Sequence, residues 1–551
     1  MTPARDGDRL DGDRFDDHDI PTVTYRHDDD SVVVIVGSGA GGATIADELS
    51  RNGIDTIVLE AGRRFKESEF VNDEWEMYDR FTWKDKRFAT GSSPTVRDFP
   101  TAPTWTCKGL GGSTLHWAAL CRRGQPYEFK TRSIYGAVDG ANVADWPICF
   151  EELEPFYVRA EDKMGISGRN GIPFHRGSTA YKVMALGAQR MGYRDFDTGH
   201  SAINVKPRDG RNACDQIGFC MQGCKSGARW STLTSELPRA EATGRCEIRT
   251  HCMALRIEHD PTGRASGVLY ADRAGRHHFQ KARLVCVAAN SVETPRLLLN
   301  SESNSFPSGL ANGSGQVGRN YMRHMNGYLY GVFERPVHMY RGIVSNGSVR
   351  DEAHNDDSRG FVGGYYYSCV GLGLPFFAAF LSPRSWGREY TNWIDAYDHV
   401  SGIHVLGEDM AMADNRVTLH PSEQDQHGLP VPCLHLDDHA NDLAMKSYAY
   451  RKGTALLEAA GATRVFQSPA LPVSHNMGTS RMSAEPQDGV VNRWGQSHEI
   501  SNLFVSDGSL FTSSMAGNPT LTIVALAIRQ AAYIVEQMRS NRLRPGFKRS
   551  N

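Results

Sequence analysis

The first strongly patterned stretch of the chain begins with five apolar residues, 32–36, which predict a fully buried strand of a parallel sheet. The next residues are spaced as in a helix whose buried face carries Ile45, Ala46 and Leu49. Gly53 stands where a left-handed residue would end that helix. A second apolar run, 56–59, predicts a neighbouring strand. This order of strand, helix and strand is typical of α/β folds.

A glycine motif joins the first strand to the helix. Gly37, Gly39 and Gly42 suit, in turn, a tight turn, a close backbone approach to a pyrophosphate and close packing of the helix on the strand. Glu60 ends the second strand, where a carboxylate can accept the ribose hydroxyls of an adenosine. Glycine clusters also form ordinary turns, but here all four features occur in order. We therefore predict a dinucleotide site with its diphosphate at the helix N-terminus.

Apolar periodicity predicts further elements along the chain. We expect a short helix near 74–80, and a turn followed by a helix with an apolar face over 146–157. Further on, 247–259 reads as a strand that turns at 260–263 and pairs back over 267–272, and 283–289 reads as a buried strand. Near the C-terminus, a strand over 502–506 leads into a polar turn. Asn518 and Pro519 are then expected as the N-cap and first residue of a buried helix.

Composition narrows the class of protein. The 551 residues exceed the length over which one core usually grows, so two domains are expected. A net charge of −3 gives no electrostatic case for a nucleic-acid partner. The apolar runs are shorter than the ~20 residues of a membrane helix, so no transmembrane segment is expected. The Asp-rich residues 1–30 predict a flexible tail that lacks the apolar core of a secretory signal, and 541–551 form a basic C-terminal tail.

A second glycine-rich segment spans 107–117. Gly111 and Gly112 would let the backbone lie against a flat ligand, and Ser113 offers a hydroxyl. A glycine-rich surface loop is the alternative interpretation of this segment alone.

Three cysteines lie close together in a chain whose eleven cysteines do not otherwise suggest disulfides. Cys214, Cys220 and Cys224 are separated by five and then three residues, with glycines between them. Thiolates are soft ligands for zinc or for an iron–sulfur cluster. Structural zinc normally has four protein ligands and no fourth lies nearby in sequence, whereas three cysteines fit a 3Fe-4S cluster. The alternative is a loop with buried free cysteines.

Several of these segments together resemble the glucose–methanol–choline (GMC) family of flavin oxidoreductases. They are the 34–62 fingerprint, GLGGSTLHW at 109–117, 146–157, 287–299, 474–482 and 502–528. The resemblance implies that the dinucleotide is FAD. The family's catalytic histidine falls on His475 and its second catalytic position on Asn518. It assigns FAD contacts to Gly37, Gly39, Gly42, Glu60, Gly111, Gly112, Ser113, His116, Asp507, Gly508, Asn518, Pro519 and Thr520.

The resemblance also implies the architecture. A Rossmann-like FAD-binding domain of an α/β (α+β overall) protein would comprise 31–145, 206–300 with the cysteine loop, and 471–540. A substrate domain built on an antiparallel sheet would be interleaved with it as 146–205 and 301–470. Backbone atoms of 251–254 would contact the adenine. His116 stands where some members attach FAD covalently and others do not, and both possibilities stay open.

These features predict an FAD-dependent dehydrogenase that oxidises a CH–OH group of a sugar, glycoside or polyol to a ketone or lactone. A histidine such as His475 can take the hydroxyl proton at neutral pH, flavin N5 takes the hydride, and Asn518 holds the alcohol oxygen. The cysteine spacing is similar to that of the family's iron–sulfur sugar dehydrogenases. It implies a 3Fe-4S cluster on Cys214, Cys220 and Cys224 that passes electrons to a cytochrome or quinone.

Two other functions remain open: an oxidase of the same fold that reduces oxygen to peroxide, with a structural cysteine loop, and a non-redox lyase that keeps FAD as a scaffold. The family resemblance further implies a small subunit carrying an export signal and a cytochrome c acceptor. The expected location is the cytoplasm, or the periplasm after export with that subunit.

Overall fold

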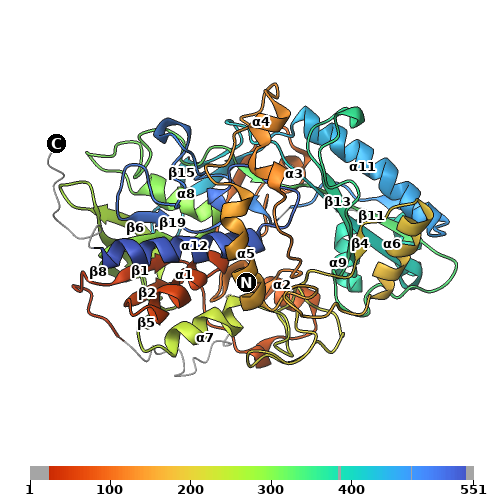
Figure 1. Cartoon of the computed structure of the whole chain (residues 1–551), viewed down its shortest axis with the longest axis horizontal. Helices are drawn as coiled ribbons and strands as arrows, with labels where there is room; N and C mark the ends of the chain where they lie inside the picture. The colour runs from red at the N-terminus through yellow and green to blue at the C-terminus, as the bar shows by residue number, and fades with distance from the viewer. Residues whose placement is uncertain (1–23, 382–385, 473, 541–551) are drawn as a thin grey trace, which may run out of the picture.

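The structure is a computed structural model of the chain that describes residues 24–381, 386–472 and 474–540. A parallel sheet and its helices form one side of the molecule, and an antiparallel sheet with its own helices forms the other (Figure 1). The expected α/β class with an interleaved antiparallel sheet is confirmed. The predicted tails at 1–23 and 541–551 lie outside the described residues.

The parallel sheet has five strands in the order β19-β9-β1-β2-β5. Their bounds are Leu503–Val505, Leu284–Val287, Val33–Val36, Thr56–Leu59 and Cys246–Arg249. The four residues of β1 and of β2 are all buried, as their apolar runs predict. Helix α1, Ala40–Arg51, packs against α12, Thr520–Arg539, and against α7, Glu236–Glu241. Gly53 has a φ of +82° just after α1, so the predicted left-handed helix end is confirmed.

The expected single strand over 247–259 is wrong in one respect. His251 has a φ of +54°, and this break divides the segment into β5 of the parallel sheet and β6, Met253–His259. Strand β6 starts a separate antiparallel sheet with β7, Ala265–Ala271, and β8, His277–Lys281. The predicted tail is already held at its end, because the Tyr25 amide donates to Glu247 and the Lys281 amide donates to the His27 carbonyl.

The antiparallel sheet has the order β17-β11-β14-β13-β12-β4. These strands are Arg464–Gln467, Met325–Val332, Val400–Gly407, Tyr365–Val370, Ser348–Val349 and Phe196–Asp197. Helices α6, Thr179–Arg190, and α11, Ala440–Ala459, pack on it (Figure 1). The register places Tyr328 of β11 opposite His404 of β14. One face of this sheet thereby carries ring side chains toward the other half of the molecule.

A two-stranded ribbon connects the halves. Strand β10, Met322–Arg323, pairs antiparallel with β18, Asn476–Met477. This register brings the residues just beyond the ribbon, His324 and His475, side by side.

Strands β15, β16 and β3 form a small sheet and occupy Arg416–Gln424, Pro430–His435 and Phe88–Thr90. The other α-helices are α2, Glu74–Phe81, α3, Pro94–Asp98, α4, Thr131–Tyr135, α5, Phe150–Met164, α8, Asn290–Asn300, α9, Leu374–Leu381, and α10, Arg388–Asp395.

Helix α12 is the one helix in the described ranges that is long and apolar enough to cross a membrane. Its most apolar window is nevertheless 78% buried inside the protein, against α1 and α5. Its apolar character therefore matches its place in the core. The helix begins at Thr520 with Pro519 as its N-cap, one residue later than the sequence predicts.

A buried carboxyl group ties α4 to the antiparallel sheet. Glu408 directly follows β14 and is 2% exposed. Both of its oxygens accept hydrogen bonds from the Tyr135 hydroxyl, at 3.0 and 2.9 Å, and one accepts from the Gly364 amide. Burial, reinforced by the nearby Glu128 carboxylate, raises the pKa of Glu408 to about 8.

We predict that Glu408 makes the protein less stable as the pH rises. Its pKa is raised in the folded state, so the stability that depends on the protonated carboxyl is complete below about pH 4.5 and is lost as the pH approaches about 8. Glu408→Gln should remove up to about 1.4 kcal/mol per pH unit from the pH dependence of the unfolding free energy. Denaturant unfolding between pH 5 and 9 measures this, with the exposed Glu536→Gln as control. An unchanged pH slope in Glu408→Gln would contradict the assignment.

Candidate active site

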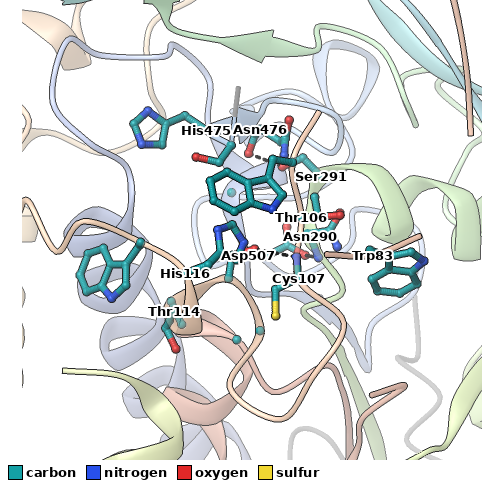
Figure 2. Close-up of a pocket in the computed structure, with 18 of the residues that line it drawn as sticks. Trp83, Thr106, Cys107, Thr114, His116, Asn290, Ser291, His475, Asn476 and Asp507 are labelled. Carbon is teal, nitrogen blue, oxygen red and sulfur yellow. Dashed lines mark hydrogen bonds between the residues drawn. The ribbon is translucent and has the colours of Figure 1, made fainter. Parts of the chain in front are cut away.

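A cavity of about 300 Å³ extends from the ends of β1 and β2 to the antiparallel sheet. It is lined by residues from the glycine motif, the 107–117 segment, 252–255, α8 and the C-terminal segments, together with ring side chains of β11 and β14. Figure 2 shows His475 and Asn476 at the top of this cavity, with His116 and Cys107 below them. The structure therefore brings segments from the whole length of the chain to one site.

The three motif glycines have three different environments. Gly37 has a φ of +96°, and a Cβ there would lie 2.4 Å from the Ala288 carbonyl oxygen. A Cβ at Gly42 would lie 2.1 Å from the Gly37 carbonyl oxygen, so the helix could not pack on the strand. At Gly39, by contrast, a Cβ would meet only Gly112 Cα at 4.0 Å. The missing side chain at Gly39 leaves space in the cavity, which is what a closely approaching ligand requires.

The N-terminus of α1 faces this space and fits an anion. Gly39 caps the helix without a side chain, and the first turn holds no acidic residue. The exposed amide groups and the helix dipole there favour a negatively charged group such as a diphosphate. The pyrophosphate of FAD therefore fits the residues present.

Glu60 lines the cavity, but protein groups already hold its carboxylate. One oxygen accepts from the Ser38 hydroxyl at 2.5 Å and the Ser38 amide at 3.2 Å, and the other accepts from the Gly62 amide at 2.8 Å. Burial raises the pKa of this carboxyl. A carboxylate has about four lone-pair sites, so Glu60 retains capacity for a ribose hydroxyl. The sequence did not indicate that Glu60 also fixes the turn of Ser38.

The second glycine segment closes one side of the cavity. Gly111 and Gly112 have φ values of +109° and +52°, which bring the chain against the Gly39 turn. The His116 ring stacks on Trp105 at 4.4 Å, and its Nε2 has no hydrogen-bond partner within the described ranges. Burial and the nearby Arg229 lower the pKa of His116 to about 3, so the ring is neutral. Ser113 also lines the cavity, where a flat ring system would contact these residues.

The remaining predicted FAD residues lie at two helix N-termini. The Asp507 carboxylate accepts from Ser509 and also from the Asn290 amide and Thr294 hydroxyl at the start of α8, so it stabilises protein turns. Gly508 lines the cavity beside it. Pro519 and Thr520 line it at the start of α12. Of the residues 251–254 that the resemblance assigns to the adenine, 252–254 line the cavity and His251 is not among its lining residues.

His475 and Asn518 are adjacent, with 3.4 Å between His475 Nε2 and Asn518 Nδ2. The other ring nitrogen, His475 Nδ1, is 3.0 Å from His324 Nδ1. Asn518 Oδ1 accepts a hydrogen bond from the Tyr366 hydroxyl. Burial, and then the neighbouring His324 and His404, lower the pKa of His475 well below its usual 6.5. His475 is therefore an uncharged imidazole at neutral pH, able to accept a proton.

Sequence reasoning missed the residues that the antiparallel sheet contributes. His404 stacks on Tyr328 at 4.3 Å, and burial lowers its pKa to about 3. His324, Tyr366 and His404 reach the site through strand register and the β10–β18 ribbon. No local motif marks any of them; only a histidine inside the apolar run of β14 gave a weak signal.

The cysteine loop forms a separate feature beside the glycine segment. Cys214, Cys220 and Cys224 line one cavity of about 20 Å³. Within the described residues, however, no group of three His, Cys, Asp or Glu side chains is arranged to hold a metal ion. Burial raises the pKa of Cys214 to about 12 and that of Cys220 to about 11. The predicted ligand set is thus gathered along one cavity without converging as metal ligands.

The parallel sheet, glycine turn and neutral histidine pair define a flavin-type dinucleotide-binding oxidoreductase. The sequence patterns of the GMC oxidoreductase family match residues 33–326 and 411–527, and the chain belongs to that family. It is an FAD-dependent oxidoreductase that acts on CH–OH donors.

Individual relatives match over nearly the whole chain. The 2-methyl-1,2-propanediol dehydrogenase of Mycolicibacterium austroafricanum is 33% identical, covering 92% of this chain and 95% of its own. The fructose dehydrogenase large subunit of Gluconobacter japonicus is 29% identical, with coverages of 92% and 98%. The crystal structure of pyridoxine 4-oxidase from Mesorbium loti shares the fold, with a TM-score of 0.62, 18% identity and coverages of 92% and 99%.

We predict that the purified protein is yellow and that Gly39→Val abolishes flavin binding. The new Cβ would meet only Gly112 Cα, at the ordinary contact distance of 4.0 Å, so the fold should persist while the ligand's approach is blocked. Flavin absorbance per chain measures binding, and thermal unfolding checks the fold. Ala242→Val, at the exposed end of α7, is the control. Full flavin content in Gly39→Val would contradict the assignment.

Proposed function

We propose that this protein is a dehydrogenase that oxidises a secondary or primary alcohol group of a neutral polyol or sugar. The observation that carries the proposal is the part of the cavity lining on the antiparallel-sheet side, which we call the opposite wall and define as the lining residues within 324–406. These residues include Asn326, Ser345 and aromatic or aliphatic side chains, and none of them is Asp, Glu, Lys or Arg. The lowered pKa values of His404 and His475 keep these rings uncharged as well.

A wall of this kind favours an uncharged substrate with both polar and apolar surface. An ionised sugar acid or an amino sugar would lose its hydration there without gaining an opposite charge. Two relatives support the same class, because their names specify a diol and a sugar, 2-methyl-1,2-propanediol and fructose.

The residues of the site divide the reaction between them. Bound FAD supplies the hydride acceptor for the carbinol carbon. His475 lines the cavity, and its Nε2 takes the hydroxyl proton, since its ring is neutral. The Asn518 amide beside it holds the alcohol oxygen, and Tyr366 fixes the amide from its other end. Burial of the site excludes water from the proton acceptor and from the bound flavin.

We predict that His475→Ala loses between about 10² and 10⁴-fold in the rate of flavin reduction by substrate, because it removes the proton acceptor. FAD content should stay at the wild-type level, since the glycine turn is untouched. Asn518→Ala should lose less, because it removes a hydrogen bond and leaves the base. Stopped-flow flavin bleaching with a panel of diols and sugars provides the rates. A His475→Ala protein as fast as wild type would rule out this role.

We further propose that the cysteine loop is the exit route for electrons. A 3Fe-4S cluster on Cys214, Cys220 and Cys224 would require these side chains to turn toward one another, since in this structure they line one small cavity without converging. Two contacts to the flavin-side segment support the route. The Gly223 amide donates to the Leu115 carbonyl at 3.2 Å, and the Arg229 guanidinium donates to the same carbonyl at 2.8 Å. The loop is thus bonded directly to the chain beside His116.

The charge of Arg229 also suits anionic sulfur. This guanidinium is 2% exposed, and its hydrogen bonds in the described structure go to carbonyl oxygens, with no carboxylate partner. Its backbone amide donates to Cys224 Sγ at 3.3 Å. A buried cation without a counter-charge is costly, and thiolates or an anionic cluster would supply that charge. Such a cluster, when bound, would accept single electrons.

We predict that Cys220→Ser separates the two half-reactions. Substrate should still bleach the flavin in a single turnover, whereas iron and steady-state reduction of a cytochrome or quinone should be lost. Cys246→Ser, a buried cysteine of β5, is the matched control and should keep both activities. Wild-type protein without iron after anaerobic preparation, or full partner-linked turnover in Cys220→Ser, would make the loop structural. Stoichiometric peroxide formation would then favour an oxidase.

A further inference from the structure

We infer that His324 is a positioning residue for this reaction. With the carbonyl group of Ser514, it selects the tautomer of His475 whose Nε2 is free to accept a proton. The inference rests on the proposed function of His475 as the base. It assigns a task to a residue of the antiparallel-sheet half that no sequence motif marks.

The first step concerns His324 itself. Its Nε2 lies 3.2 Å from the Ser514 carbonyl oxygen, which can only accept a hydrogen bond. His324 Nε2 therefore carries the hydrogen. Burial lowers the pKa of His324 to about 4, so the ring is neutral and its Nδ1 is a bare acceptor.

The second step determines which ring nitrogen of His475 carries the hydrogen. The two Nδ1 atoms are 3.0 Å apart, and two lone pairs cannot face each other at that distance. His475 Nδ1 must therefore carry the hydrogen and donate it to His324. In the neutral ring, Nε2 of His475, a residue that lines the cavity, is then unprotonated.

Asn518 gives the same answer from the opposite side. Its Oδ1 accepts from the Tyr366 hydroxyl, so its Nδ2 faces His475 Nε2 at 3.4 Å as a donor. A donor on that side requires a bare Nε2. The hydrogen-bond directions agree along the whole chain of residues. Tyr366 donates to Asn518, which donates to His475 Nε2. His475 Nδ1 donates to His324, whose Nε2 donates to the Ser514 carbonyl.

The backbone holds both ends of the His324 link. His324 has a φ of +36°, in the left-handed region that a residue with a side chain rarely adopts. Such strain persists where the surroundings fix it, here between β10 and β11, and it is common at functional sites. The Asp409 amide donates to the Ser514 hydroxyl at 2.8 Å, and the Arg323 amide donates to the Asp409 carboxylate at 2.7 Å. Asp409 thus links Ser514, whose carbonyl accepts from His324, to Arg323, the residue before His324.

Two substitutions at one position test the inference. In His324→Gln, the carboxamide can donate to the Ser514 carbonyl and accept from His475 Nδ1, which repeats the pattern of the imidazole. His324→Leu can do neither. We expect His324→Leu to lose between about 10² and 10⁴-fold in the rate of flavin reduction by a diol, and His324→Gln to stay within about 10-fold of wild type.

The control separates positioning from folding. His175→Leu removes another buried imidazole that is hydrogen-bonded to a carbonyl, the one of Ile203, and that does not line the active-site cavity, so it should keep the wild-type rate. Flavin content and thermal unfolding are measured on each protein.

Neutron diffraction from the wild-type holoenzyme makes the test independent of any variant. Deuterium on His324 Nε2 and His475 Nδ1, with a bare His475 Nε2, is the expected result, and deuterium on His475 Nε2 alone overturns the inference. Equal losses in His324→Gln and His324→Leu, or a wild-type rate in His324→Leu, overturn it as well while leaving the base role of His475 in place. If no alcohol reduces the wild-type flavin, the proposed function fails and this inference fails with it.

Discussion

The hydrogen bond between Ser38 and Glu60 is the contact on which the cofactor half of the site depends. The Ser38 hydroxyl donates to the carboxylate at the end of β2 and accepts from the Gly111 amide at 2.9 Å, while its carbonyl accepts from Thr232. One residue of the β1–α1 turn therefore connects two strands of the parallel sheet to the second glycine segment. Because these contacts are buried, each unpaired group would carry a desolvation cost. The network fixes the distance at which Gly39 and Gly112 face the cavity.

The catalytic half is assembled on a different principle. Its histidines are uncharged because they are buried, and no described acidic side chain in the opposite wall compensates a charge on them. Burial disfavours the protonated, positively charged form of an imidazole. Proton uptake by His475 is therefore favoured only as negative charge develops on the substrate oxygen. Low basicity and precise tautomer control therefore belong together: a weak base contributes only when its free nitrogen points at the reacting proton.

The sequence predicted the site residues that lie in local motifs. It did not predict those that reach the site through pairing between distant strands. The roles of Gly37, Gly39 and Gly42 follow from strand and helix geometry within one short segment, and the structure reproduces their three environments. The break at His251 was missed because both halves of 247–259 have strand-like composition, and only the parallel partner β2 decides where β5 ends. His324 and Tyr366 were missed for a similar reason. Their place in the site is set by pairing across strands far apart in the chain, and the residues around them carry no motif.

The two glycine-rich segments and the cysteine loop together suggest how one scaffold separates proton and electron movement. In the proposed reaction, the substrate's proton moves toward His475, on the side formed by β10, β11 and β18. The cysteine loop lies on the other side of the glycine segment, bonded to it through Gly223 and Arg229. Arg229 would favour negative charge at the cysteines, whereas the uncharged histidine wall provides no such cation. In the proposed electron route, this charge distribution favours electron movement away from the base, and the glycine segment lies between the cysteine loop and the histidines.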